Sequence, residues 1–194
     1  RTGKVTRVPG VGTFRTPDRA GGWVAYALPA DESSEAKAAG EDEAAVELGR
    51  SKSAGKPMVL RELATGAERR FESVADFVFS ADGRRLAYVV STEDATGDGL
   101  FVVDVAGGEP VAVLTGPGEY KRLVWDEAGE QLAFLTSRDD AESEEPSFAL
   151  YHWRAGSGSA VKLAAEGDAG VPAGWWVSEH GAVSFSRDGS RVFF

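Results

Sequence analysis

The sequence predicts an all-β fold: a partial β-propeller of about three four-stranded antiparallel blades plus the first half of another. Three observations support this prediction. One hairpin template recurs along the chain, its copies are spaced as propeller blades are, and a second hairpin of constant design follows each of the first three copies. We therefore expect one propeller domain over residues 1–194.

Each copy of the template has an alternating apolar run that ends on an aromatic residue, a polar stretch with a glycine, and a second alternating run. Period-two alternation on both sides of a glycine turn is typical of a β-hairpin. The clear copies are 76–90 (DFVFSADGRRLAYVV), 123–136 (LVWDEAGEQLAFLT) and 183–194 (VSFSRDGSRVFF). A degenerate copy covers 16–28, where Gly21 and Gly22 precede WVAYAL.

The spacing of the closing aromatic residues defines the units. These residues are Tyr26, Tyr88, Phe134 and Phe194, at intervals of 62, 46 and 60 residues. Four short strands and three turns need about 40 to 50 residues, so the middle interval is a bare blade and the longer ones carry insertions. The expected units cover about residues 14–74, 75–118, 119–166 and 182–194, with insertions at about 29–56 and 167–181.

The outer strands of the first three units form the second set of hairpins. They are MVLREL with ERRF (58–71), LFVVDV with PVAVLT (100–115), and ALYHW with AVKLA (149–164). Glu62 and Asp104 precede two of the turns. Acidic residues at the end of an outer strand usually solvate a turn, so we do not expect them to be metal ligands.

The first insertion, at about 29–56, is acidic and polar, with seven acids and one Lys between Asp31 and Glu47. Ala and Glu favour a short helix over Ser34 to Leu48, but the segment has no apolar face, so we expect a frayed helix or disorder. A flap that gates the propeller channel is the functional alternative. A calcium site in the acidic loop Asp139 to Glu145 stays open as a weaker alternative, since the loop lacks the oxygen spacing and the glycine of a calcium-binding loop.

The second insertion, 167–181, contains GVPAGWWVSEHG and supplies the candidate binding residues Trp175, Trp176 and His180. Two adjacent tryptophans are costly to expose to water, so we expect something to cover them. One interpretation is a plug that packs across a blade or against a following domain. The other is an aromatic surface near the channel mouth that meets a peptide substrate or a catalytic domain. The isolated His180 fits a hydrogen-bonded structural residue better than a general base.

Composition excludes several classes of partner. The chain has 31 acidic and 21 basic residues and a net charge of −10, which is unfavourable for binding nucleic acid. No apolar run approaches the roughly 20 residues of a membrane helix, so no membrane span is expected. The absence of cysteine excludes disulfides and thiolate metal sites but leaves the compartment open.

The sequence contains no catalytic motif. It has no G-x-S-x-G, no H-E-x-x-H, no phosphate-binding loop and no dinucleotide fingerprint, and the segment 156–159 (GSGS) is expected to be a turn between strands. The two histidines, His152 and His180, are too isolated for a zinc site. We therefore expect no catalytic residue, no metal and no cofactor in this chain.

The repeat FSADGRRLAY and FSRDGSRVFF, followed by LFVVDVAGGEP, resembles the TolB-like β-propeller repeat. Together with WVAYALP, VLRELATG and GWWVSEHG, it makes nearly the whole chain similar to the N-terminal propeller region of bacterial serine peptidases of the prolyl oligopeptidase family. The resemblance implies a propeller that restricts which peptides reach the Ser, Asp and His of an α/β-hydrolase domain. None of these catalytic positions has a counterpart here.

Two functions stay open, because TolB-like protein-binding propellers use the same repeat. The chain is either the non-catalytic propeller portion of a larger serine peptidase, with a hydrolase domain downstream, or a protein-binding scaffold without enzymatic activity. The resemblance implies a periplasmic or extracellular location, and a cytoplasmic one stays open.

Both ends of the chain predict further sequence. The opening residues 1–4 (RTGK) are neither an initiator Met nor a signal peptide, and Phe194 closes only the second strand of a unit, so we expect residues before Arg1 and after Phe194. An incomplete ring exposes strand edges, so we also expect this chain to self-associate.

Overall fold

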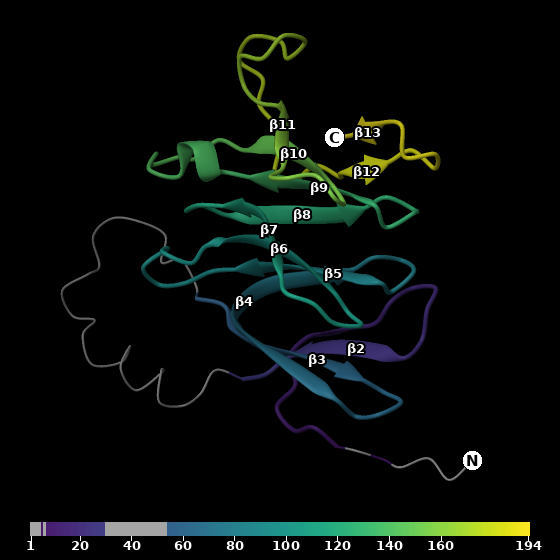
Figure 1. Ribbon diagram of the computed structural model, residues 1–194. Coiled ribbons are helices and arrows are strands. Elements are labelled where there is room, and N and C mark those ends of the chain that lie inside the picture. Colours follow the sequence, from purple (N-terminus) through teal and green to yellow (C-terminus); the bar gives the residue numbers. More distant parts are fainter. Residues whose placement is uncertain (1–4, 6, 30–53) are drawn as a thin grey trace, which may run out of the picture.

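The computed structural model describes residues 5, 7–29 and 54–194, and in these ranges the regular structure is almost entirely β (Figure 1). One 3-10 turn, η1 (Arg138–Asp140), is the exception. The strands of the described ranges are β1 (Phe14–Arg15), β2 (Trp23–Ala27), β3 (Lys56–Glu62), β4 (Glu68–Phe79), β5 (Arg85–Val90), β6 (Gly99–Asp104), β7 (Val111–Thr115), β8 (Tyr120–Trp125), β9 (Gln131–Thr136), β10 (Ala149–Arg154), β11 (Val161–Ala164), β12 (Ser184–Phe185) and β13 (Val192–Phe193). The predicted helix or flap in the first insertion lies outside the described residues.

The strands form three sheets in which each strand pairs antiparallel with its neighbours in the sequence. The first sheet has the order β1-β2-β3-β4-β5-β6-β7, the second β11-β10-β9-β8, and the third β12-β13. Figure 1 shows successive hairpins stacked one above another from the N-terminal to the C-terminal end of the chain. The all-β prediction is therefore confirmed. The predicted hairpins are present, except that the first strand of the degenerate copy, β1, lies at Phe14–Arg15, before the predicted range 16–28.

Strand β4 differs from the prediction because it is one continuous strand of 12 residues. The sequence predicted an outer strand that ends at Phe71 and a new hairpin that starts at Asp76. In the structure the first part of β4 pairs with β3 and the second part with β5, and the register shifts between Val74 and Asp76. Ser73, with φ of 55°, bends the strand at this change of partner. The exact residue ranges of the units stay a prediction.

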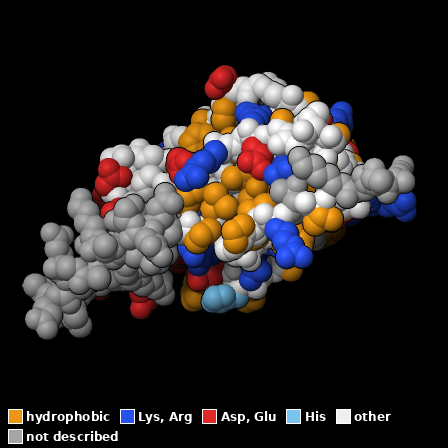
Figure 2. Space-filling model, turned by 90° about the horizontal axis from the view of Figure 1, so that it is seen from below, with side chains coloured by type: hydrophobic (Ala, Val, Ile, Leu, Met, Phe, Trp, Pro, Cys, Tyr) orange, Lys and Arg blue, Asp and Glu red, His pale blue; other side chains and the backbone are white. Residues whose placement is uncertain are grey.

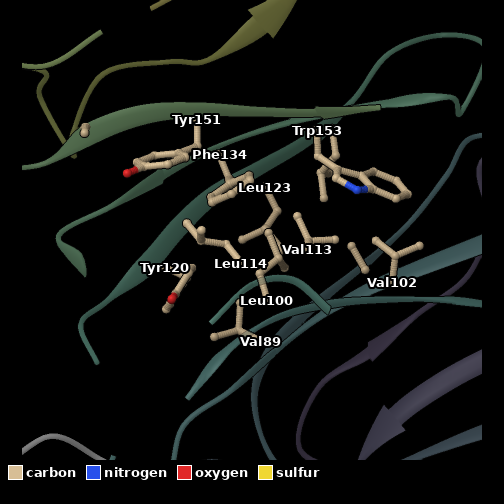
Figure 3. Close-up of a cluster of buried hydrophobic side chains, with 13 residues drawn as sticks. Val89, Leu100, Val102, Val113, Leu114, Tyr120, Leu123, Phe134, Tyr151 and Trp153 are labelled. Atoms are coloured by element: carbon tan, nitrogen blue, oxygen red, sulfur yellow. The ribbon is translucent and has the colours of Figure 1, made fainter. Parts of the chain in front are cut away.

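The inner strands of the second sheet are apolar on both faces because this sheet packs against the first sheet on one side and the third on the other. All six residues of β9 are buried. Leu132 and Phe134 belong to a core shared with β5, β6 and β7, whereas Ala133 and Leu135 belong to a core shared with β12 and β13. Figure 3 shows the first of these cores, with side chains of both sheets facing one another. This two-sided burial is the packing of stacked propeller blades.

The closing aromatic residues of the template pack against the next strand outwards. Tyr88 stacks on Phe101 at a centroid distance of 5.7 Å, and Phe134 stacks on Tyr151 at 5.8 Å. The fourth closing residue, Phe194, is 59% exposed. In the described chain, β13 has no strand on its outer side to cover this ring.

Candidate functional site

The template turns of the second and fourth units are built by a serine and an aspartate two residues apart. Ser80 donates its hydroxyl to Asp82 Oδ1 at 2.7 Å, and Ser186 donates to Asp188 Oδ1 at 2.6 Å. The same carboxylates accept a backbone N–H further along each turn. The turns of the second and fourth units therefore share one hydrogen-bonding pattern, whereas in the third unit Asp126 itself accepts the backbone N–H groups of Glu130 and Gln131.

The Ser186 turn also sets the protonation of its aspartate. Hydrogen bonds from the Ser186 hydroxyl and from the backbone and hydroxyl of Ser190 lower the pKa of Asp188 to about 2. Because these bonds favour the carboxylate, they stabilise the fold at neutral pH, and this contribution is lost as the pH falls from the ordinary value of 3.8 towards 2.

Ser186→Ala is expected to raise the pKa of Asp188 towards 3.8, because it removes the largest cause of the shift. Carboxyl NMR titration of the variant and the wild-type protein measures this change. The pKa of Asp82, whose own serine is intact, serves as the internal control. A wild-type Asp188 that titrates near 3.8 would contradict the hydrogen-bonded turn.

An open groove of about 410 Å³ lies where these turns and the inner strands of successive units converge. Its walls are residues 78–79 of β4, 123–125 of β8 and 184–185 of β12, so three units contribute one strand each. Trp125 crosses between two units, and its Nε1 donates to the carbonyl of Val78 at 3.2 Å. Convergence of one inner strand per blade is the geometry of a propeller axis.

The rim of the groove carries charges of both signs. Glu127 forms an ion pair with Arg19 at 2.9 Å and lies 3.9 Å from Arg187. Asp18 also lines the groove. A rim with exposed arginines and carboxylates can bind both ends and the side chains of a polar peptide.

Sequence reasoning missed these rim residues. A signal was present, because Glu127 and Arg187 both directly follow the first residue of a template turn, Asp126 and Ser186. Alternation concerns only the apolar positions of the repeat, so it does not indicate these charged positions.

The predicted binding residues Trp175 and Trp176 lie on the connection between β11 and β12. Their side chains are 67% and 64% exposed. The described residues therefore do not cover them, and the interpretation as a plug packed across a blade is not what these residues show. Two exposed tryptophans in sequence form an apolar contact surface.

The tryptophan segment is held in place by buried and hydrogen-bonded neighbours. Val177 is 4% exposed and forms an antiparallel bridge with Phe148. Arg122 donates its Nε to the carbonyl of Glu179 at 3.0 Å and its Nη2 to that of His180 at 3.2 Å. Phe148 precedes β10 at the end of the sheet near η1, opposite to the Ser and Asp turns. The structure thus separates the tryptophans from the charged groove.

His180, the third predicted binding residue, is not brought into a site. Its side chain is 88% exposed, and its Nε2 lies 3.8 Å from the carboxylate of the adjacent Glu179. Its backbone N–H donates to Ser178 Oγ at 3.2 Å. The partners that the described structure gives His180 are Ser178, Glu179 and Arg122, not the tryptophans.

Other candidate residues have structural contacts. His152 on β10 is partly buried and lies 3.0 Å from Gln131 Oε1, and burial lowers its pKa. Asp104 accepts the backbone N–H of Ala106, and Glu62 accepts the hydroxyl of Thr65, as expected for turn residues.

The acidic loop near η1 is likewise engaged within the protein. Asp139 accepts the Tyr151 hydroxyl at 2.7 Å, and Asp140 accepts the backbone N–H of Ser147 at 2.7 Å. Within the described ranges, no three His, Asp or Glu side chains gather in a way that could hold a metal ion. These ranges also contain no helix with the length and hydrophobicity that a membrane span requires.

No family model and no curated protein sequence matches the chain. Several solved structures do. The β-propeller domain of the Trilobed protease from Pyrococcus furiosus, which has an open velcro topology, aligns with a TM-score of 0.54 and 18% identity over 79% of this chain and 41% of that chain. The acylaminoacyl peptidase from Pyrococcus horikoshii aligns with a TM-score of 0.53 and 14% identity over 79% of this chain and 25% of that chain.

A prolyl endopeptidase structure also aligns, with a TM-score of 0.50 and 12% identity over 79% of this chain and 21% of that chain. The chain thus spans less than half the length of each of these proteins. At such identities the likeness shows the fold. The chain has the fold of a partial β-propeller of the kind found in these peptidases, and the predicted resemblance is confirmed at that level.

Proposed function

We propose that this chain is the non-catalytic propeller portion of a larger serine peptidase of the prolyl oligopeptidase type. In this role it limits which substrates reach a downstream α/β-hydrolase domain and contacts that domain. The substrate class is peptides, and the proposed location is the periplasm or the exterior of the cell.

The observation that carries this proposal is the groove at the convergence of β4, β8 and β12. One strand from each of three units lines it, and Arg19, Glu127 and Arg187 give its rim charges of both signs. An open groove of about 410 Å³ with charges of both signs on its rim can contact an extended polar chain. The peptidases with similar propellers support the same role.

The test uses the native gene product isolated from its source. We expect a mass several times the 20.5 kDa of this chain and covalent labelling by a fluorophosphonate probe. Labelling must be lost after heat denaturation, which serves as the control. A native product of 20.5 kDa that does not react with the probe would overturn the peptidase proposal.

A second candidate is a protein-binding propeller without enzymatic activity. It is favoured by the exposed Trp175 and Trp176, because tryptophan is enriched among residues that contribute most to protein–protein affinity. The surface lies away from the groove, so a partner could bind there without blocking it.

Replacing both tryptophans by alanine is expected to change the free energy of unfolding by less than about 0.5 kcal/mol, since neither side chain is buried. Partner affinity should fall by roughly 30-fold or more if these are the dominant contacts. Urea denaturation measures the first quantity. For the second, proteins retained from an extract of the source by the immobilised wild-type chain and by the variant are compared by mass spectrometry. Identical sets of retained proteins would contradict the binding role.

A further inference from the structure

The innermost strands of the second, third and fourth units each direct one peptide group towards the groove. Successive residues of an antiparallel ladder point their backbone N–H and C=O alternately towards the paired strand and away from it. The residues that donate their backbone N–H across the hairpin, each at 2.9 Å, are Ser80, Asp126 and Ser186. The residues before them, Phe79, Trp125 and Phe185, therefore direct their peptide groups away from the ladder, and all three line the groove.

These inward edges belong to the arrangement of the blades. The innermost strand of a blade has only the central channel on its inner side, however many blades the propeller contains. In the described chain, β8 is the last strand of its sheet, and residues 76–79 of β4 pair with β5 alone. A row of unpaired backbone groups is a ready template for another extended chain.

Strand β8 offers the most accessible of these edges. It has six residues, whereas β12 has two. On β4, the N–H of Phe77 bonds to Asp76 Oδ1 at 2.8 Å, and the Val78 carbonyl accepts the indole N–H of Trp125. Of the three strands in the described chain, β8 therefore leaves the longest inward edge for a ligand.

The rim of the groove complements an acidic group. The carboxylate of Glu127 lies 2.9 Å from Arg19 but 3.9 Å from Arg187. The side chain of Arg187 is 94% exposed, so it is the rim cation with the weaker partner in the described chain. A carboxylate of a bound peptide can pair with Arg187 while the ion pair between Arg19 and Glu127 stays intact.

We propose that the groove binds an extended peptide as an added strand on the inward edge of β8, and that an acidic side chain of the peptide pairs with Arg187. The pairing is antiparallel, as between the neighbouring strands of the described sheets, so the peptide residue opposite Trp125 exchanges two backbone hydrogen bonds with it. Because β8 runs towards the rim, the acidic residue stands on the N-terminal side of the paired one. This role rests on the proposed function, since it specifies which peptides the propeller admits.

An N-methyl scan of a bound peptide tests the strand pairing. The probe is acetyl-Asp-Thr-Val-Thr-Val-Thr with a fluorophore at its C-terminal end. The protein is the native gene product after treatment with the fluorophosphonate, so that an attached hydrolase domain cannot cleave the probe. Only alternate residues of a strand face the paired edge, so N-methylation at alternate positions should weaken binding at least about tenfold, and at the positions between them less than about twofold. Fluorescence anisotropy measures each dissociation constant.

The charge requirement is tested by Arg187→Ala. Replacing the aspartate of the probe by asparagine should weaken binding to the wild-type protein about fivefold, because a charge-assisted hydrogen bond is lost. Arg187→Ala should bind both probes equally. Arg191→Ala is the matched control and should keep the preference for aspartate, because Arg191 is an exposed arginine of the same turn outside the lining of the groove. A preference that survives Arg187→Ala would contradict the assigned pairing.

Photo-cross-linking locates the bound probe. With photo-leucine in place of one valine of the probe, cross-links are expected within residues 123–127 and 184–187. A second hollow, of about 430 Å³, lies on the first unit, and Figure 2 looks onto this side of the molecule, where hydrophobic side chains gather between charged ones. Cross-links at that hollow, or at the outer strands β7 and β11, would overturn the proposal.

The outcomes also separate this site from the peptidase role. No binding of the probe, or a loss of affinity that does not alternate along it, would overturn the strand pairing. A native product that binds the probe in the groove but does not react with the fluorophosphonate would contradict the peptidase proposal alone. A product that reacts with the fluorophosphonate but does not bind the probe would contradict the strand pairing alone.

Discussion

Phe134→Ala is expected to lower the free energy of unfolding by about 3 to 5 kcal/mol, because it empties the centre of a core with no room to collapse. The ring is fully buried and packs against Tyr120 and Tyr151, at centroid distances of 6.3 and 5.8 Å. It lies between the second and third units, as Figure 3 shows, so its loss weakens their stacking as well as one sheet. Urea denaturation followed by tryptophan fluorescence measures the change.

The control for this substitution is Val161→Ala on β11. Val161 is 58% exposed, so the substitution is expected to lower the free energy of unfolding by less than about 1 kcal/mol. This small decrease reflects strand propensity alone. If the two substitutions cost the same, Phe134 would not lie in a packed core between blades.

Gly129→Ala is expected to lower the free energy of unfolding by about 2 to 5 kcal/mol, for two separate reasons. The residue has φ of 69°, where a side chain costs about 1 to 2 kcal/mol. The added carbon would also lie 2.9 Å from Ser80 Cβ on the neighbouring unit, and overpacking of this kind costs about 1 to 3 kcal/mol. Equilibrium unfolding in urea checks the sum.

Gly156→Ala separates the two costs. Gly156 has φ of 80° but no atom within 4 Å of an added carbon, so only the backbone cost of about 1 to 2 kcal/mol applies. If Gly129→Ala and Gly156→Ala lowered the free energy of unfolding equally, the turns of adjacent units would not be in contact.

The hairpins were predictable because their information is local. Alternating residues and a glycine in Asp76 to Val90 determine two strands and a turn, and the structure places β4, β5 and the Ser80 turn there. The turn roles of Asp104 and Glu62 follow in the same way.

Part of the site was not predictable for a physical reason. Exposure depends on which surfaces meet in three dimensions, so the sequence suggested a cover for Trp175 and Trp176 that the described structure does not contain. The rim charges Arg19, Glu127 and Arg187 come from three turns far apart in the sequence, and only stacking of the units brings them together.

The sequence by itself determined the β-hairpins, their repeat and the propeller class, because alternation, glycine turns and closing aromatics act over a few neighbouring residues. Only the tertiary structure decided that β4 continues through two units, that β9 is buried on both faces, and that each turn holds the glycine of the next. These features depend on contacts between residues of different units, and no local pattern specifies them.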